Sequence, residues 1–241
     1  MKKAIAIAAM LLLSACSTKT DFSAMEDGEI FDIGLKRLAS ERHEEAAEAF
    51  RHVELAHPYS DLLMRSFKLQ GFALYRERRY FDAIEVFQKI LRYDPMGEHA
   101  PYAMYMIALS YYDQISPITR EQRMTQMALT AMEALVEKFP ESEYAGDVKP
   151  KITIARNMLA AKEMFTARAL VRGKNIVAAL NRYQTVIVKF ESTLFVPEAL
   201  FRAAEIYGMM GADEDARNMI VVLRLNFPDS EWTARSVRIV P

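Results

Sequence analysis

Few residues in this 241-residue chain could carry out catalysis or bind a metal. The chain has four histidines, His43, His52, His57 and His99, and one cysteine, Cys16. No two histidines lie four residues apart, the spacing that places two imidazoles on one helix face around a zinc ion. The eight glycines form no glycine-rich phosphate loop. The sequence therefore predicts no catalytic residue, no metal site and no cofactor.

The cysteine lies in a context that indicates lipid attachment. Lys2 and Lys3 precede an apolar run over residues 4–13, and Leu13-Ser14-Ala15-Cys16 follows. A basic head, a short apolar stretch and small residues before a cleavage site are the parts of a secretory signal. The run is too short to span a bilayer, which needs about 20 residues. Leu-Ser-Ala-Cys resembles the bacterial lipobox, which implies cleavage after Ala15 and acylation of Cys16. The alternative is an ordinary signal with a chance cysteine.

These features predict three parts in the chain. Residues 1–15 would be the signal peptide, residues 16–27 a mostly polar lipidated tether, and residues 28–241 a repeat domain with a C-terminal cap. Ser17 follows the cysteine, whereas an aspartate there would favour retention in the inner membrane. We therefore expect a lipid anchor in the outer membrane and a body that faces the periplasm. The net charge of -1 gives no indication of a nucleic-acid surface.

A repeat organises the rest of the chain. A small residue is followed after 12 residues by an alanine, after 4 more by a bulky residue, and after 8 more by a turn residue. The third pass has eight extra residues between its first two anchors. The five passes are Gly34, Ala46, Phe50, Pro58; Gly71, Ala83, Phe87, Pro95; Ala108, Ala128, Met132, Pro140; Ala167, Ala179, Tyr183, Glu191; and Ala204, Ala216, Ile220, Pro228.

Each anchor has a steric role in a pair of antiparallel helices. The two small residues let the helices approach, the bulky residue fills the space between them, and proline ends the second helix. The pattern resembles the tetratricopeptide repeat. It predicts an all-α, right-handed superhelical solenoid of about five helical hairpins, with the tail 232–241 covering the last apolar face.

Two local features qualify this pattern. Pro150 lies within the fourth pass and is expected to kink a long helix or to mark its true start. Thr119 and Gln122, near the insertion of the third pass, could form a capping box for the following helix.

The first helix of each hairpin lines the concave groove in this repeat class. The positions one and four residues after the small anchor are Leu35 and Leu38 in the first hairpin, and Phe72 and Tyr75 in the second. With Arg76 beside them, they predict a groove for an extended peptide that has aromatic side chains and a free carboxylate. The alternatives are that the apolar residues are core, and that Arg76 only complements a helix C-terminus.

Several segments also carry a resemblance to one family. They are Tyr102-Ala103-Met104-Tyr105-Met106, Pro140-Glu141-Ser142-Glu143-Tyr144-Ala145, Ala178-Ala179-Leu180-Asn181-Arg182-Tyr183, Pro197-Glu198-Ala199-Leu200 and Pro228-Asp229-Ser230-Glu231-Trp232. Together with the lipobox and the five repeats, they make the chain similar to the BamD family, the lipoprotein subunits of the β-barrel assembly machine of bacterial outer membranes. The resemblance covers nearly the whole mature chain.

The resemblance implies a role without catalysis and two protein partners. The N-terminal repeats would recognise C-terminal signals of unfolded outer-membrane proteins, and the C-terminal repeats would hold a BamA-like β-barrel insertase. Arg182, with Asn181 beside it, matches a family position tied to coupling with BamA. The sequence departs from the family pattern at two places. Glu191 stands where the repeat has proline, and His57-Pro58-Tyr59 replaces an aromatic–proline pair near the substrate groove.

Two other functions remain open from the sequence. One is a periplasmic repeat lipoprotein that coordinates cell-wall synthesis or envelope constriction during division. The other is a lipid-anchored enzyme that uses a carboxylate pair. The first would co-purify with cell-wall enzymes, and the second would need carboxylates with shifted pKa values in one cleft.

The lipobox makes a direct prediction. Cys16→Ala removes the acylated sulfur, so we expect the variant to leave the outer membrane and to appear uncleaved in the inner membrane or soluble in the periplasm. Membrane fractionation measures this distribution. Outer-membrane fractionation like that of the unchanged protein would contradict lipidation at Cys16.

Overall fold

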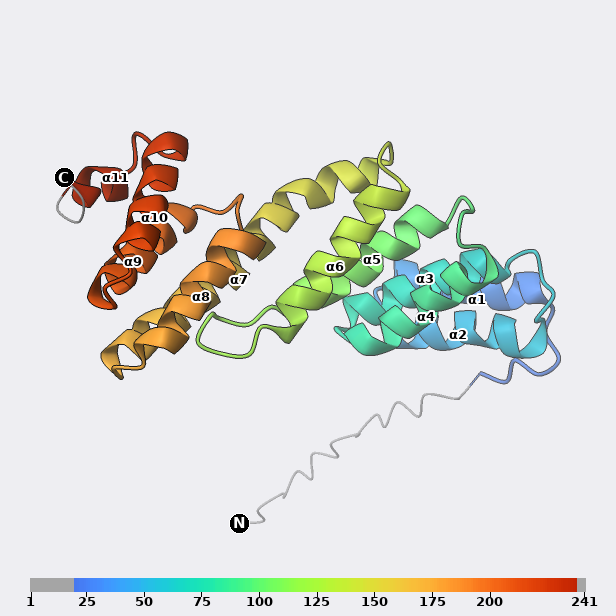
Figure 1. The fold of residues 1–241 in the computed structure, drawn as a ribbon. Coiled ribbons are helices and arrows are strands. Elements are labelled where there is room, and N and C mark those ends of the chain that lie inside the picture. Colours follow the sequence, from blue (N-terminus) through green and yellow to red (C-terminus); the bar gives the residue numbers. More distant parts are fainter. Residues whose placement is uncertain (1–19, 238–241) are drawn as a thin grey trace, which may run out of the picture.

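The structure is a computed structural model that describes residues 20–237 of the chain (Figure 1). These residues form eleven helices. Ten of them form five consecutive hairpins, and α11 follows the last hairpin. None of the described helices is long and apolar enough to cross a bilayer. The helices are α1 (Asp27–Ala39), α2 (His43–Ala56), α3 (Leu63–Arg76), α4 (Tyr80–Tyr93), α5 (Ala100–Tyr112), α6 (Arg123–Lys138), α7 (Glu143–Arg172), α8 (Ile176–Lys189), α9 (Val196–Met209), α10 (Asp213–Asn226) and α11 (Glu231–Ser236). The predicted all-α stack of five hairpins is confirmed.

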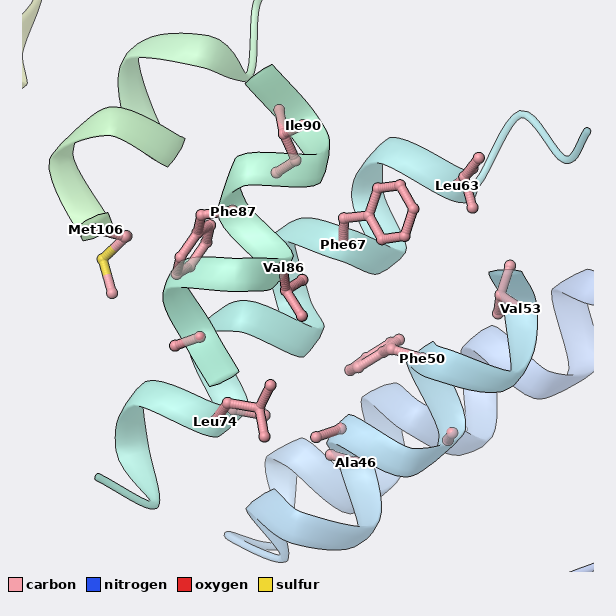
Figure 2. Close-up of a cluster of buried hydrophobic side chains, with 14 of the residues drawn as sticks. Ala46, Phe50, Val53, Leu63, Phe67, Leu74, Val86, Phe87, Ile90 and Met106 are labelled. Carbon is pink, nitrogen blue, oxygen red and sulfur yellow. The ribbon is translucent and has the colours of Figure 1, made fainter. Parts of the chain in front are cut away.

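The first two hairpins close around a glycine and a phenylalanine ring. A Cβ atom built on Gly34 would lie 2.6 Å from Phe50, and one built on Gly71 would lie 2.6 Å from Phe87. Both rings are fully buried, as Figure 2 shows within the N-terminal core. These distances are shorter than any real Cβ contact, so the two helices of each hairpin can pack this closely only because the small anchor has no side chain.

The later hairpins use alanine in place of glycine, and their anchors are buried as the repeat predicts. The bulky anchors of these three hairpins are Met132, Tyr183 and Ile220, and each is at most 1% exposed. The alanines that face them are Ala108, Ala128, Ala167, Ala179, Ala204 and Ala216, all buried.

The repeat also fixes a residue that the sequence did not single out. In four hairpins the residue seven positions after the small anchor has a positive φ, which turns the chain between the two helices. These residues are Glu41 (58°), Arg78 (58°), Lys174 (61°) and Gly211 (75°). The conformation costs an L-residue free energy because its Cβ crowds the following carbonyl, whereas glycine adopts it freely. Among these four turns, only that of the fifth hairpin uses glycine.

The 30-residue helix α7 joins two parts of the core. Its first half supplies Val148 and Ala155 to a cluster with α5 and α6, and its second half supplies Met164 and Ala167 to a cluster with α8 and α9. Phe190, which follows α8, packs against both clusters. A single continuous helix therefore connects the N-terminal hairpins to the C-terminal ones.

The structure corrects two local expectations. Pro150 does not mark the start of α7, which begins at Glu143 and continues through the proline, and the alternative of a kink in a long helix stays a prediction. The carbonyl that loses its helical donor belongs to Gly146, which is exposed, so water can replace the missing hydrogen bond. Thr119 and Gln122 form no capping box. Gln122 is itself the N-cap of α6, and its amide nitrogen donates to three loop carbonyls, those of Ser116, Pro117 and Arg120.

The packed body begins earlier than the predicted tether allows. Phe22 is only 4% exposed and its ring centroid lies 4.6 Å from that of His52 on α2. Arg37 on α1 lies over the Phe22 ring and donates to the Thr20 hydroxyl at 2.6 Å. Of the predicted tether 16–27, residues 20–26 therefore dock on the first hairpin. The remaining part, with Cys16 and the signal peptide 1–15, lies outside the described residues.

The C-terminal cap consists of α11, and residues 238–241 of the predicted cap lie outside the described residues. Trp232 stacks on Phe201 of α9 with ring centroids 5.3 Å apart. Arg202 and Arg235 lie over the same indole, at 5.1 and 4.6 Å. This short helix thereby covers the end of the last hairpin, which a stacked array requires for solubility.

The close contact at Gly71 predicts a large effect from one added methyl group. Gly71→Ala should lower the free energy of unfolding by about 1–3 kcal/mol, because the new Cβ forces the Phe87 ring out of its site. Gly208→Ala on α9, where a Cβ meets nothing within 4 Å, should be neutral or stabilising. Urea denaturation measures both. Equal stability of the two variants would contradict the packing described for the second hairpin.

The turn geometry predicts a stabilising substitution. Lys174→Gly should raise the free energy of unfolding by about 0.5–1 kcal/mol, since glycine removes the strain of the positive φ. Gly211→Ala introduces the same strain in the fifth hairpin and should lower stability by a similar amount. Thermal unfolding of the pair should show shifts of opposite sign, and shifts of the same sign would refute this explanation.

Candidate functional site

The predicted groove residues lie on the first helices of two adjacent hairpins and all reach the surface. Leu35 on α1 is 38% exposed, and Leu38 is half-buried against the N-terminal core. On α3, Phe72 and Tyr75 are half-buried and Arg76 is exposed. Phe72 and Tyr75 therefore pack on the core with part of each ring, and the rest of each ring is exposed.

Arg76 is placed to meet an anion. Its guanidinium carbon lies 5.9 Å from the centroid of the Phe72 ring, which holds the side chain over α3. Among residues 20–237 it forms no ion pair. A guanidinium that is held by a ring but has no carboxylate partner can receive a carboxylate from outside the chain.

Two further cations on α3 lie over aromatic rings of the neighbouring hairpins. Arg65 lies 5.0 Å from the centroid of Phe31 on α1, and the Lys68 ammonium lies 4.7 Å from that of Tyr102 on α5. We call the six residues the aromatic–cationic surface: Phe31, Arg65, Lys68, Phe72, Arg76 and Tyr102. Sequence reasoning found Phe72 and Arg76, but missed the other four because their pairing crosses hairpins.

A cluster of four tyrosines, Tyr75, Tyr102, Tyr105 and Tyr144, continues this surface onto α5 and α7. The Tyr144 ring lies 5.0 Å from Tyr105 and 5.7 Å from Tyr102. The Tyr75 hydroxyl donates to Asp113 at 2.5 Å, and the Tyr105 hydroxyl donates to Asp147 at 2.9 Å. These bonds tie successive hairpins together along one side of the array.

Burial raises the pKa values of the hydroxyls in the tyrosine cluster. Burial raises the pKa of Tyr102 and of Tyr105 to about 12, and the hydrogen bond to Asp147 adds to the effect on Tyr105. Burial and then the bond to Asp113 raise the pKa of Tyr75. The hydroxyls therefore stay protonated and act as hydrogen-bond donors. No group of three or more His, Cys, Asp or Glu side chains in residues 20–237 is arranged to hold a metal ion.

The predicted partner residues Arg182 and Asn181 lie on α8, in the fourth hairpin. The Arg182 side chain is 50% exposed, and its Nη1 lies 3.1 Å from Oε2 of Glu163 on α7. The paired carboxylate therefore belongs to the neighbouring helix of the same hairpin and not to α8 itself. Asn181 is exposed beside it. The pairing orients the guanidinium and leaves half of its surface for a partner.

A cavity of about 300 Å³ lies in the same hairpins and was not predicted from the sequence. Arg168, Arg172 and Arg202 line it together with apolar side chains of α8 and α9, and Tyr183 forms part of its wall. Tyr183 is only 1% exposed. The sequence pattern identified Tyr183 only as the bulky anchor of its hairpin.

Known proteins match nearly the whole described chain in sequence. Residues 23–223 match the family YfiO, described as an outer membrane lipoprotein. A protein of Caulobacter vibrioides named outer membrane protein assembly factor BamD is 33% identical over 247 residues, covering 99% of this chain and 81% of the relative. The protein of that name from Rickettsia prowazekii is 31% identical over 232 residues, covering 95% of this chain and 92% of the relative.

Solved structures of lower identity also match most of this chain. The TPR2AB domain of yeast Sti1 in complex with an HSP90 peptide gives a TM-score of 0.41 at 11% identity, covering 88% of this chain and 95% of that one. The Thermus thermophilus protein TTC0263 gives 0.37 at 13% identity, covering 89% and 99%.

The family model matches residues 23–223, and two relatives above 30% identity each align with at least 95% of this chain. The chain belongs to the YfiO family of outer membrane lipoproteins, together with the assembly factors named BamD.

Proposed function

We propose that this chain is a non-enzymatic scaffold and substrate-recognition lipoprotein of the outer-membrane β-barrel assembly complex. The observation that carries the proposal is the full-length similarity to relatives named outer membrane protein assembly factor BamD. A stack of five hairpins with exposed aromatic and basic side chains is suited to binding protein segments, since it presents a long surface on a rigid support.

The proposed location is the periplasmic side of the outer membrane. The family is described as an outer membrane lipoprotein. The lipobox supplies the corresponding attachment point at Cys16, and acyl chains contribute about 0.8 kcal/mol per buried methylene. Several chains on one residue therefore hold the protein at the bilayer, and the helical body serves as its water-exposed part.

The N-terminal hairpins are proposed to recognise the C-terminal signals of unfolded outer-membrane proteins. The aromatic–cationic surface offers the half-buried rings of Phe72 and Tyr102 to apolar and aromatic side chains. Arg76, which forms no ion pair within residues 20–237, offers its guanidinium to a terminal carboxylate. A charge-assisted hydrogen bond between these groups favours a free C-terminus over an internal segment.

The C-terminal hairpins are proposed to hold a BamA-like insertase. Arg182 is suited to this contact because the planar guanidinium can form two parallel hydrogen bonds with a carboxylate. Glu163 already orients it at 3.1 Å, so a partner gains a positioned donor without ordering a free side chain.

The experiment that tests the function is an affinity purification of the lipidated, tagged protein from detergent-solubilised outer membranes, followed by mass spectrometry. We expect a large β-barrel protein with periplasmic repeat domains to co-purify. Recovery of cell-wall synthases or division proteins in its place would redirect the function to envelope constriction and leave the fold unaffected.

The role of Arg76 predicts a selective loss of peptide affinity. Arg76→Gln should weaken binding of a peptide with aromatic residues and a free C-terminal carboxylate by about three- to tenfold, which is about 0.7–1.4 kcal/mol. The same peptide with an amidated C-terminus should bind both proteins equally. Arg92→Gln, on the exposed end of α4, is the matched control. Calorimetric titration that shows no difference between the two peptides would exclude carboxylate recognition by Arg76.

The role of Arg182 predicts a loss of the insertase. Arg182→Leu should reduce co-purification of the β-barrel partner by about tenfold, because an interface arginine at a central position contributes more than about 1 kcal/mol. Arg217→Leu on the exposed face of α10 controls for loss of charge. Circular dichroism should show that both variants keep their helices. Undiminished recovery with Arg182→Leu would move the interface to another surface.

A further inference from the structure

A cleft of about 500 Å³ lies on the N-terminal hairpins between α2 and α4, with α3 as its floor. Its volume falls in the range of sites that bind small ligands or side chains. Each of the three helices contributes polar and apolar groups to its lining, among them Glu48 and Arg51 on α2, Gln70 and Leu74 on α3, and Glu85 and Val86 on α4.

The cleft and the aromatic–cationic surface use opposite sides of α3. A helix turns about 100° per residue, so Gln70 and Leu74 share one face, while Phe72 and Arg76 point roughly the opposite way. Occupancy of the cleft therefore requires neither Arg76 nor the rings that surround it. Binding in the cleft and the proposed function of the aromatic–cationic surface can thus be tested separately.

The floor of the cleft contains a polar group that lacks its hydrogen bond. Gln70 is 5% exposed, and its Oε1 atom is buried with no donor in the described part of the chain. The Ser66 hydroxyl, one turn earlier on the same helix, is likewise buried without a partner among those residues. A buried acceptor without a donor destabilises the fold, so its presence at the bottom of a cleft points to a donor that arrives from outside.

The charges in the cleft are unevenly paired. At its ends, Arg79 contacts Asp82 at 2.7 Å and Glu44 at 3.9 Å, and Lys89 contacts Glu54 at 2.5 Å. In its middle, Glu48 and Glu85 form no ion pair within residues 20–237. Among the cations that line the cleft, only Arg51 forms no ion pair within residues 20–237. The groups without an ion pair are therefore the carboxylates of Glu48 and Glu85 and the guanidinium of Arg51, and their net charge is -1.

The two carboxylates occupy equivalent positions of consecutive repeats. Glu48 and Glu85 each follow the alanine anchor by two residues. The same position holds Thr130, Asn181 and Asn218 in the other three hairpins. Acidic residues therefore occur at this position only in the two hairpins whose second helices form the walls of the cleft.

We propose that the cleft binds an arginine side chain from an extended segment of a partner protein. The aliphatic stem lies on Leu74 and Val86, and the guanidinium reaches the floor. Its five N–H donors serve the Gln70 amide oxygen and the two wall carboxylates, and no other side chain offers as many donors in one plane. The segment runs between α2 and α4, which leave the cleft open along its length.

The test is an NMR titration of the ¹⁵N-labelled full-length mature protein in a neutral detergent. The probe is the blocked peptide acetyl-Ala-Ala-Arg-Ala-Ala-amide. Its matched control has citrulline, which keeps the shape of arginine and removes the charge. We expect the arginine peptide to shift amide resonances of α2, α3 and α4, and to bind at least tenfold more tightly than the citrulline peptide.

Three variants locate the site. Gln70→Met keeps the side-chain volume and removes the amide. Affinity for the arginine peptide should fall at least tenfold, and the melting temperature should rise because no buried acceptor is left without a donor. A glutamine with only a structural role would not give both results. Glu85→Gln, at the exposed wall, should also weaken binding and leave the fold unchanged. Glu137→Gln, an exposed carboxylate on α6, should bind as the unchanged protein does.

The outcomes that overturn the proposal are equally specific. One is equal binding of the arginine and citrulline peptides. Another is unchanged affinity in both Gln70→Met and Glu85→Gln. A third is resonance shifts confined to the aromatic–cationic surface. If Gln70→Met does not fold, the Glu85→Gln and citrulline measurements still decide the question.

Discussion

The close approach of the two helices of a hairpin over a small residue, glycine in the first two hairpins and alanine in the other three, is the contact on which the array depends. Gly34 under Phe50 and Gly71 under Phe87 bring the helices of each hairpin together to a distance that a single methyl group would disrupt. This approach aligns the first helices along one side of the array and the second helices along the other. The aromatic–cationic surface and the cleft both result from that alignment, because each combines residues from three helices.

Helix α3 shows how one element can support two chemistries. One of its faces carries Arg65, Lys68 and Arg76, each held over a ring. The other carries Gln70 on the floor of the cleft, between two carboxylates. The first face suits an anion beside aromatic groups, and the second suits a cation with an aliphatic stem. Since α3 is packed between α2 and α4, neither face can move without disturbing the core, so both sites are preorganised.

The sequence was sufficient for the packing anchors that repeat along the chain, and insufficient for contacts that cross between repeats. The anchors from Gly34 to Ile220 follow fixed spacings, so their burial and the hairpin count were predictable. The pairing of Tyr105 with Asp147, 42 residues apart, follows no local pattern and was missed. The docking of Phe22 was missed because a single aromatic residue in a polar stretch gives no periodic signal. Whether a helix starts at a proline or runs through it depends on whether water reaches the freed carbonyl, which only the fold decides.

The docked segment before α1 limits the distance between the first hairpin and the bilayer in the proposed anchored state. Four residue steps separate Cys16 from Thr20, and an extended chain spans at most about 3.6 Å per residue, or about 14 Å. A lipid on Cys16 would thus hold the first hairpin within one helix diameter or so of the headgroups. The last hairpin lies at the far end of the array (Figure 1). In that proposed state, so short a tether would restrain the position of the N-terminal hairpin at the bilayer far more tightly than that of the C-terminal hairpin.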